Sequence, residues 1–313
     1  MKLIKVHTIG AVAAGAVMIA AAGCGTQANG SASGTSKPTI VVGSKNFTEN
    51  ILLGDMTVDL LKQAGYPVEN KTDLGGTTEN RQALKSGQIS LYWEYTGTAL
   101  VDFDHVVKRI PNPAKVYDIV KKDDAKLGLV WLKRAPLNDT YSIMVRQSWA
   151  TRTHVHTISQ WAHYINTHPG AVKFASDNEF AVRPDGLPGV EKAYHFLLPS
   201  SQVVVMNSGL VYLALKDKKV NAAMGFSTNG AIEAYHLINL QDNKGFFPVY
   251  NPAPVVRKQI LQDYPGMKKI LGKLAPKLTT NTMIHLTNEV DLQHKPAQTV
   301  ATDWLKQEGL LKS

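Results

Sequence analysis

Short apolar segments alternate along the chain with segments in which apolar residues recur at helical spacing. Residues 39–43 have the length and composition of a buried strand. The helix that follows is predicted to begin at Thr48, a good N-cap, and to end at Gly65. Further strands are predicted at 68–72, 130–132, 141–145 and 172–175, and further helices at 79–84, 113–127, 158–168, 188–196, 267–274, 280–290 and 297–309. Strands that alternate with helices indicate mainly parallel α/β sheets.

One pattern within this series occurs twice. Residues 83–98 predict the end of a helix, a turn at Gly87, a buried strand and then an exposed aromatic residue, Tyr95, before a Gly-Thr loop. A degenerate copy 131 residues later has Phe226 in the place of Tyr95. Ligands of open α/β sheets bind beyond the carboxyl ends of the strands. The repeat therefore predicts a fold of two lobes that point Tyr95 and Phe226 into one cleft.

Length and charge narrow the possible functions. The 313 residues are enough for two domains, and a hydrophobic content of 44% allows a sizeable core. A net charge of +9 is typical of proteins that bind nucleic acid. Here, however, Lys and Arg are scattered along the chain, with no run longer than two. A solvated surface near an acidic membrane or wall is the preferred interpretation, so no nucleic-acid partner is expected.

The N-terminus predicts secretion and lipid anchoring. Lys2 and Lys5 precede an Ala-rich apolar run, and residues 1–23 read as a signal peptide. The run ends in Ala-Ala-Gly-Cys, which resembles a bacterial lipoprotein box, with the sole cysteine, Cys24, at the lipidated position. An ordinary signal peptide is the alternative. Residues 24–38 predict a flexible tether, so the protein is expected outside the cytoplasm, held on the cell membrane.

Other chemical motifs are weak. A single cysteine excludes an internal disulfide and a cysteine-based metal site. Four histidines gather in one segment without a carboxylate or cysteine to complete a zinc site, and a surface cluster is expected for His154, His156, His163 and His168. A Gly-Lys-Leu sequence ending at Leu274 departs from a P-loop in spacing and in its last residue. No metal, cofactor or catalytic residue is predicted, and an enzyme on a two-lobed fold remains a minor alternative.

Several spaced motifs together resemble a known family, the substrate-binding proteins of ABC importers for glycine betaine, choline and related osmoprotectants. The resemblance covers about residues 39–310. It rests on Gly43-Ser44-Lys45-Asn46-Phe47-Thr48-Glu49, Gly76-Thr77-Thr78, Glu94-Tyr95-Thr96-Gly97-Thr98, Asn138-Asp139-Thr140-Tyr141, the loop from Glu179 to Arg183-Pro184-Asp185-Gly186, and Pro248-Val249-Tyr250.

The resemblance implies a clamp of the type II periplasmic-binding-protein kind that closes on its ligand. Lobe 1 would comprise residues 39–138 and 250–313, and lobe 2 residues 139–249. An aromatic cage for a quaternary ammonium group would consist of Tyr95, Tyr141, Phe226 and Tyr250. The family usually has Tyr where this chain has Phe226, which keeps the ring face and loses the hydroxyl.

The resemblance also implies a clasp for a ligand carboxylate, formed by Lys45, Thr98 and Arg183. Each aromatic ring contributes roughly 0.5–2 kcal/mol, and micromolar affinity needs about 8 kcal/mol, so a second anchor is expected. Thr98 favours a carboxylate-bearing ligand because an acidic residue there would repel it, so glycine betaine ranks above choline. Choline, carnitine or an amino acid remain alternative ligands.

Two further acidic residues are assigned to lobe closure, Glu179 and Asp139. The implied partners are a small quaternary ammonium ligand, the permease of an ABC transporter, and the membrane through the lipid anchor. The protein is expected to be a monomer.

Overall fold

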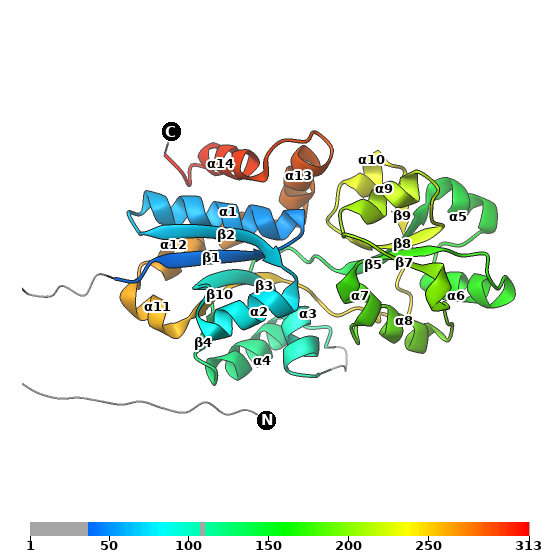
Figure 1. Ribbon diagram of the computed structural model, residues 1–313, viewed down its shortest axis with the longest axis horizontal. Helices are drawn as coiled ribbons and strands as arrows, with labels where there is room; N and C mark the ends of the chain where they lie inside the picture. The colour runs from blue at the N-terminus through cyan, green and yellow to red at the C-terminus, as the bar shows by residue number, and fades with distance from the viewer. Residues whose placement is uncertain (1–36, 107–109, 313) are drawn as a thin grey trace, which may run out of the picture. The chain divides into compact units, whose positions relative to one another are not determined.

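The structure, a computed structural model, describes residues 37–106 and 110–312, and these contain two five-stranded sheets. The predicted signal peptide, Cys24 and the tether up to residue 36 lie outside the described residues. We call the first sheet with its helices lobe 1 and the second sheet with its helices lobe 2 (Figure 1). In the described part of the chain, no helix has the length and apolar character needed to cross a membrane.

The sheet of lobe 1 has the order β2-β1-β3-β10-β4. Its strands are β1 (Ile40–Lys45), β2 (Val68–Gly75), β3 (Leu91–Tyr95), β4 (Leu129–Trp131) and β10 (Pro252–Arg257). Its helices are α1 (Thr48–Gln63), α2 (Thr77–Ser86), α3 (Thr96–Thr98), the π-helix η1 (Ala99–Phe103), α4 (Pro113–Ala125), α11 (Lys258–Asp263), α12 (Met267–Leu274), the 3₁₀ turn η3 (Ala275–Lys277), α13 (Thr280–Asp291) and α14 (Ala297–Gln307). Helix α1 covers one face, with α13 and α14 beyond it, and α2 and α4 cover the other (Figure 1).

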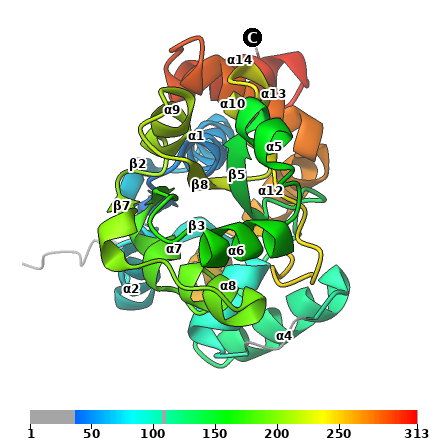
Figure 2. The same cartoon turned by 90° about the vertical axis from the view of Figure 1, so that its right-hand side faces the viewer.

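The sheet of lobe 2 has the order β7-β6-β8-β5-β9. Its strands are β5 (Tyr141–Arg146), β6 (Phe174–Ser176), β7 (Val203–Val205), β8 (Ala222–Phe226) and β9 (Leu237–Asn239). Its helices are α5 (Gln147–Thr153), α6 (Ile158–Thr167), α7 (Asn178–Val182), α8 (Leu187–Tyr194), the 3₁₀ turn η2 (Ser200–Gln202), α9 (Leu210–Lys216) and α10 (Ala231–Ala234). Figure 2 shows α5, α9 and α10 on one side of this sheet and α6, α7 and α8 on the other.

Both sheets share one topology, which confirms the predicted α/β clamp. Four strands of each sheet run in one direction, and one strand, β10 or β5, runs antiparallel to both of its neighbours. Each reversed strand is the first strand after the chain passes from one sheet to the other. The core of each lobe contains large buried side chains, such as Trp93 and Trp131 in lobe 1 and Trp161 in lobe 2.

Several local predictions were wrong. Strand β10 was missed because Pro252 and Pro254 weaken a strand pattern, yet both accept hydrogen bonds through their carbonyl groups, from Ala135 N (2.8 Å) and Leu132 N (2.9 Å). The three-residue strands β7 and β9 and the short helices α5, α7 and α11 were also missed. The segment from Glu179 to Gly186, predicted as a loop, contains most of α7.

Two predictions near the cleft also need correction. Thr48 is the first residue of α1 rather than its N-cap, and its hydroxyl donates to Asp291 Oδ1 at 2.6 Å. Tyr95, predicted to be exposed, is only 3% exposed, because the Phe47 ring and the Glu49 carboxylate lie against it. The residues after it form α3 and η1 instead of a loop.

Candidate functional site

The two lobes enclose a cleft of about 700 Å³. Eight of the nine residues assigned to ligand binding or closure line it: Lys45, Tyr95, Thr98, Asp139, Tyr141, Glu179, Phe226 and Tyr250. The ninth, Arg183, is not among the described residues that line the cleft. The assignment of these residues to ligand binding stays a prediction.

Strand register brings the four aromatic residues together. Tyr95 ends β3 and Phe226 ends β8, so both lie at the carboxyl end of a strand. Tyr141 begins the reversed strand β5 and pairs directly with Phe226, which places the two rings side by side. Tyr250 lies two residues before the other reversed strand, β10, whose first residue, Pro252, pairs with Tyr95.

The rings form one continuous cluster. The Tyr141 centroid lies 5.3 Å from that of Phe226, nearly stacked at 29°, and 5.3 Å from that of Tyr250, edge-on at 79°. The link to Tyr95 runs through Phe47, whose centroid is 5.0 Å from Phe226 and 5.8 Å from Tyr95. Phe47 also lines the cleft. Sequence reasoning missed this fifth ring, although it lies in the same motif as Lys45.

Carboxylates hold two of the tyrosine hydroxyl groups. The Tyr95 hydroxyl donates to Glu49 Oε1 at 2.8 Å, and the Tyr250 hydroxyl donates to Asp185 Oδ2 at 2.6 Å. Burial, reinforced by the nearby carboxylates, raises the pKa of both hydroxyls well above the ordinary value. Both residues therefore stay neutral, and these bonds fix the position of each ring.

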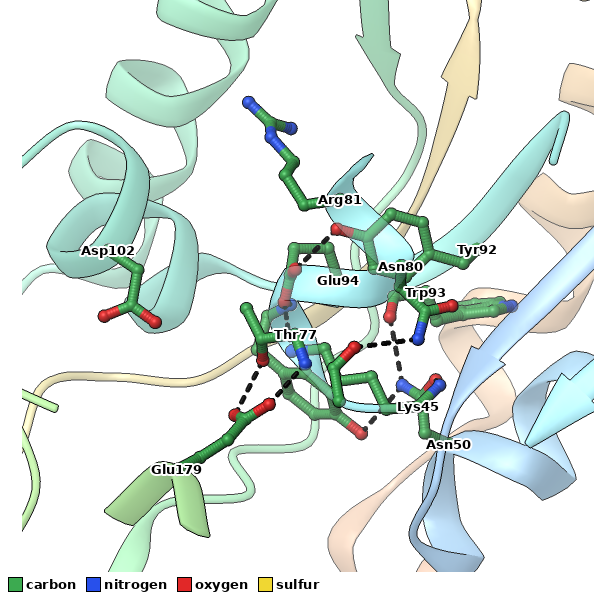
Figure 3. Close-up of polar contacts among 12 residues, drawn as sticks. Lys45, Asn50, Thr77, Asn80, Arg81, Tyr92, Trp93, Glu94, Asp102 and Glu179 are labelled. Carbon is green, nitrogen blue, oxygen red and sulfur yellow. Dashed lines mark hydrogen bonds and ion pairs between the residues drawn. The ribbon is translucent and has the colours of Figure 1, made fainter. Parts of the chain in front are cut away.

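Lys45 is engaged by a buried carboxylate. Its Nζ donates to Glu94 Oε1 at 2.6 Å, and both side chains are almost fully buried (Figure 3). Glu94 Oε2 accepts from the Tyr92 hydroxyl at 2.7 Å, and the Lys45 backbone N–H donates to Asn50 Oδ1 at 2.7 Å. Lys45 Nζ also lies 5.2 Å from the centroid of the Tyr95 ring, so the ammonium group stands at the edge of the aromatic cluster.

Arg183 lies behind the cleft wall, surrounded by carboxylates. Its Nε and Nη2 donate to the two oxygens of Asp185, at 2.8 and 2.7 Å. Its Nη1 lies 2.6 Å from Asp102 Oδ2 and 3.6 Å from Glu179 Oε2. The Asp102 contact is an ion pair without hydrogen-bond geometry, and Nη1 has no hydrogen-bond acceptor among the described residues.

Glu179 reaches across the cleft from lobe 2 to the start of α2 in lobe 1 (Figure 3). Its carboxylate accepts from the Thr77 backbone N–H and, at 2.8 Å, from the Thr77 hydroxyl. A helix N-terminus stabilises a negative charge because its first N–H groups are unpaired. Gly76 permits this approach, since a Cβ there would lie 2.3 Å from Glu179 Oε1.

A second contact between the lobes involves two buried carboxylates. Thr228 of lobe 2 donates to Glu49 Oε2 at 3.0 Å and also contacts Asp139 Oδ1 within hydrogen-bond distance. Burial raises the pKa of Asp139 to about 7, although Lys45 acts in the opposite direction. Burial, with the nearby Asp139 charge, raises the pKa of Glu49 well above its usual range. Glu49 was not predicted as a site residue, because an acidic residue in the first turn of a helix usually faces solvent.

The four histidines lie apart from the cleft, on the surface of lobe 2, and their side chains are exposed as predicted. Across residues 37–106 and 110–312, no group of three or more His, Cys, Asp or Glu side chains is placed to hold a metal ion.

Comparison with known proteins identifies the family. Residues 38–307 match the family model for the substrate-binding domain of the ABC-type glycine betaine transport system. A glycine-betaine-binding protein of Pseudomonas aeruginosa is 36% identical over 278 residues, covering 87% of this chain and 89% of that protein. The structure of unliganded YehZ from Escherichia coli is 35% identical with a TM-score of 0.62, covering 87% of this chain and 99% of that one.

A third relative is a crystal structure described as a glycine betaine/carnitine/choline ABC transporter. It is 28% identical with a TM-score of 0.68, and the match covers 87% of this chain and 99% of that chain. The homologues are substrate-binding proteins rather than enzymes, and their shared architecture is the two-lobed clamp. The chain thus belongs to the family of extracytoplasmic substrate-binding proteins that serve glycine betaine ABC transporters.

Proposed function

We propose that the protein captures glycine betaine or a related quaternary ammonium osmoprotectant in an aromatic cage and delivers it to an ABC importer. The observation that carries this proposal is the meeting of four rings from separate segments, Tyr95, Tyr141, Phe226 and Tyr250, at one cleft. A cleft of this volume is ordinary for a small-molecule site.

The chemistry of the ligand explains the choice of side chains. A trimethylammonium group carries no N–H, so hydrogen bonds cannot recognise it. Aromatic faces attract its charge through their quadrupoles and match its apolar methyl groups. The hydrogen bonds from Tyr95 to Glu49 and from Tyr250 to Asp185 hold these two rings in place before the ligand arrives. Such preorganisation lowers the entropy lost on binding.

The ligand's carboxylate would be held by Lys45 and Thr98, which line the cleft, with Arg183 behind them. A charge-assisted hydrogen bond contributes about 1.5–3 kcal/mol, enough to raise the affinity of the cage alone. Thr98 places no negative charge beside this group, which favours glycine betaine over choline.

Binding would close the clamp by a population shift. A ligand that contacts both lobes binds the closed form better than the open form, and so increases the closed population. Glu179 at Thr77 and Thr228 at Glu49 are contacts of this closed arrangement. The chain would cross from one lobe to the other between residues 138 and 139 and again between residues 249 and 250.

Lipidation of Cys24 after removal of residues 1–23 would hold the protein on the outer face of the cell membrane, with residues 24–38 as the tether. The clamp would act as a monomer and dock on its permease in the closed form.

Calorimetry with a panel of ligands tests the proposal. Glycine betaine, choline and carnitine are compared with glycine, which has the carboxylate of glycine betaine but an ammonium group with N–H donors. We expect glycine betaine to bind with micromolar affinity or better and glycine not to bind. Tighter binding of glycine or another amino acid would favour the alternative that the clamp serves amino acids.

A further inference from the structure

Arg183 is outnumbered by carboxylates. Both oxygens of Asp185 accept hydrogen bonds, one from Nε and one from Nη2 of Arg183. Asp102 and Glu179 both face Nη1. The Arg183 side chain is only 6% exposed, so water screens these charges poorly. One positive charge therefore faces three negative ones, and a ligand carboxylate that approached Arg183 would add a fourth.

Asp102 is the member of this group that comes from the opposite lobe. It lies in η1, one helical turn after Thr98 of the proposed clasp, and extends from that helical segment as Figure 3 shows. Residues four apart on a helix share a face, so Asp102 and Thr98 lie on the same side. The Asp102–Arg183 ion pair therefore spans the two lobes beside the clasp.

Nη1, which faces Asp102, is the guanidinium nitrogen that has no hydrogen bond to a described residue. Nε and Nη2 are committed to Asp185, whereas Nη1 has an ion pair at 2.6 Å but no hydrogen bond to a described residue. The Asp102 side chain keeps 18% of its surface exposed, compared with 4% for Asp185, so it has more freedom to withdraw. Burial also raises the pKa of Asp102 to about 6 despite the nearby Arg183, consistent with a carboxylate held there at a cost.

We propose that Asp102 is a specificity-determining residue that competes with the ligand's carboxylate for Arg183 and thereby reduces the preference for glycine betaine over choline. This inference rests on the proposed function. A carboxylate-bearing ligand must displace Asp102 or accept its repulsion, whereas choline, which has a hydroxyl in place of the carboxylate, avoids both and keeps the attraction of Asp102 for its positive charge.

The test measures the dissociation constants of glycine betaine and choline by calorimetry for the wild type and for Asp102→Asn. Asparagine has nearly the same shape and places an uncharged oxygen toward Nη1, so the change removes charge and little else. We expect the glycine betaine constant to fall at least fivefold and the choline constant to stay the same or rise. Glu79→Gln is the matched control, because Glu79 is a cleft carboxylate of the same lobe outside the Arg183 cluster, and it should alter the ratio of the two constants less than twofold.

The outcomes are distinct. Equal changes for both ligands in Asp102→Asn would show that Asp102 only closes the lobes, and would overturn the inference. The same ratio change in Glu79→Gln would assign the effect to the general charge of the cleft, and would also overturn it. A wild type that binds neither ligand would overturn the proposed function and this inference with it.

Discussion

The hydroxyl of Thr228, in lobe 2, donates to Glu49 Oε2, in lobe 1, at 3.0 Å. The same hydroxyl also contacts Asp139 Oδ1, yet it has a single proton to donate. Glu49 and Asp139 are each only 3% exposed. Two unprotonated carboxylates around one hydroxyl would repel each other in a poorly screened site. The closed clamp therefore needs an additional proton on this pair.

This requirement predicts that ligand affinity falls as the pH rises. In the closed clamp burial raises the pKa of Asp139 to about 7 and that of Glu49 in the same direction. Lys45, Tyr95 and Tyr212 are ionisable groups that face this pair. In an open, solvated clamp the pKa of both carboxyls would return to about 4. Closure thus takes up a proton. The contribution of this proton to the stability of the closed form is complete below the ordinary carboxyl pKa. It is lost as the pH rises through about 7, the pKa of Asp139 in the closed form. Calorimetry should show up to about tenfold weaker binding at about pH 8 than at about pH 6.

Glu49→Gln is the control for this pH dependence. Glutamine can still accept the hydrogen bond from the Tyr95 hydroxyl and leaves Thr228 free to donate to Asp139. The variant should bind with a flatter pH profile, and calorimetry in buffers of different ionisation enthalpy should show less proton uptake than in the wild type. A profile in Glu49→Gln as steep as in the wild type would assign the proton to another group.

Removal of one cage ring should weaken binding of every quaternary ammonium ligand. Tyr95→Ala is expected to raise the dissociation constants of glycine betaine and choline at least tenfold, because the ring contributes up to about 2 kcal/mol in a desolvated site. Tyr95→Phe is the matched variant: it keeps the ring and loses the hydroxyl, which donates to Glu49 Oε1 and accepts a long hydrogen bond from Asn50 Nδ2 at 3.5 Å. It should retain most of the affinity. If Tyr95→Ala bound both ligands as well as the wild type does, the cage assignment would be wrong.

Gly76 gives a direct test of the contact between Glu179 and α2. An alanine Cβ would lie 2.3 Å from Glu179 Oε1, while the backbone at Gly76, with φ of −79°, accepts alanine without strain. Gly76→Ala should displace the carboxylate from Thr77 and weaken ligand binding about tenfold, in line with the loss of a charge-assisted hydrogen bond. Gly272→Ala in α12 is the control, since a Cβ there meets no atom within 4 Å. Comparable affinity in the two variants would exclude a role of this contact in closure.

Sequence patterns predicted the clamp and placed Tyr95 and Phe226 in one cleft, because strand ends and their flanking residues are local features. The charge partners could not be found in the same way. Aspartate and glutamate usually lie on the surface, so the sequence gives no sign that Glu94, Asp102 and Asp185 are largely buried. Only tertiary packing places them beside Lys45 and Arg183. Burial is a property of the whole fold, so a single sequence does not reveal which charges are neutralised.

A buried ion pair between Arg81 and Asp124 stabilises the fold of lobe 1. Asp124, which is 2% exposed, receives both Nη groups of Arg81 and, at 2.7 Å, the Nε1–H of Trp131. Asp124→Ala leaves the guanidinium of Arg81, a residue that is only 7% exposed, without its partner. The loss of one member of a buried ion pair lowers the free energy of unfolding by about 3–5 kcal/mol.

Urea unfolding of Asp124→Ala should show this loss as a lower midpoint with an unchanged slope. Asp123→Ala is the matched control: it removes the neighbouring acidic residue, whose partner Lys126 is exposed, and exposed ion pairs contribute little because water and salt screen them. Its midpoint should stay at the wild-type value. Since Asp124 is not among the described residues that line the cleft, Asp124→Ala should bind ligand normally wherever it is folded. Equal midpoints for the two variants would mean that the buried pair contributes no more than the exposed one.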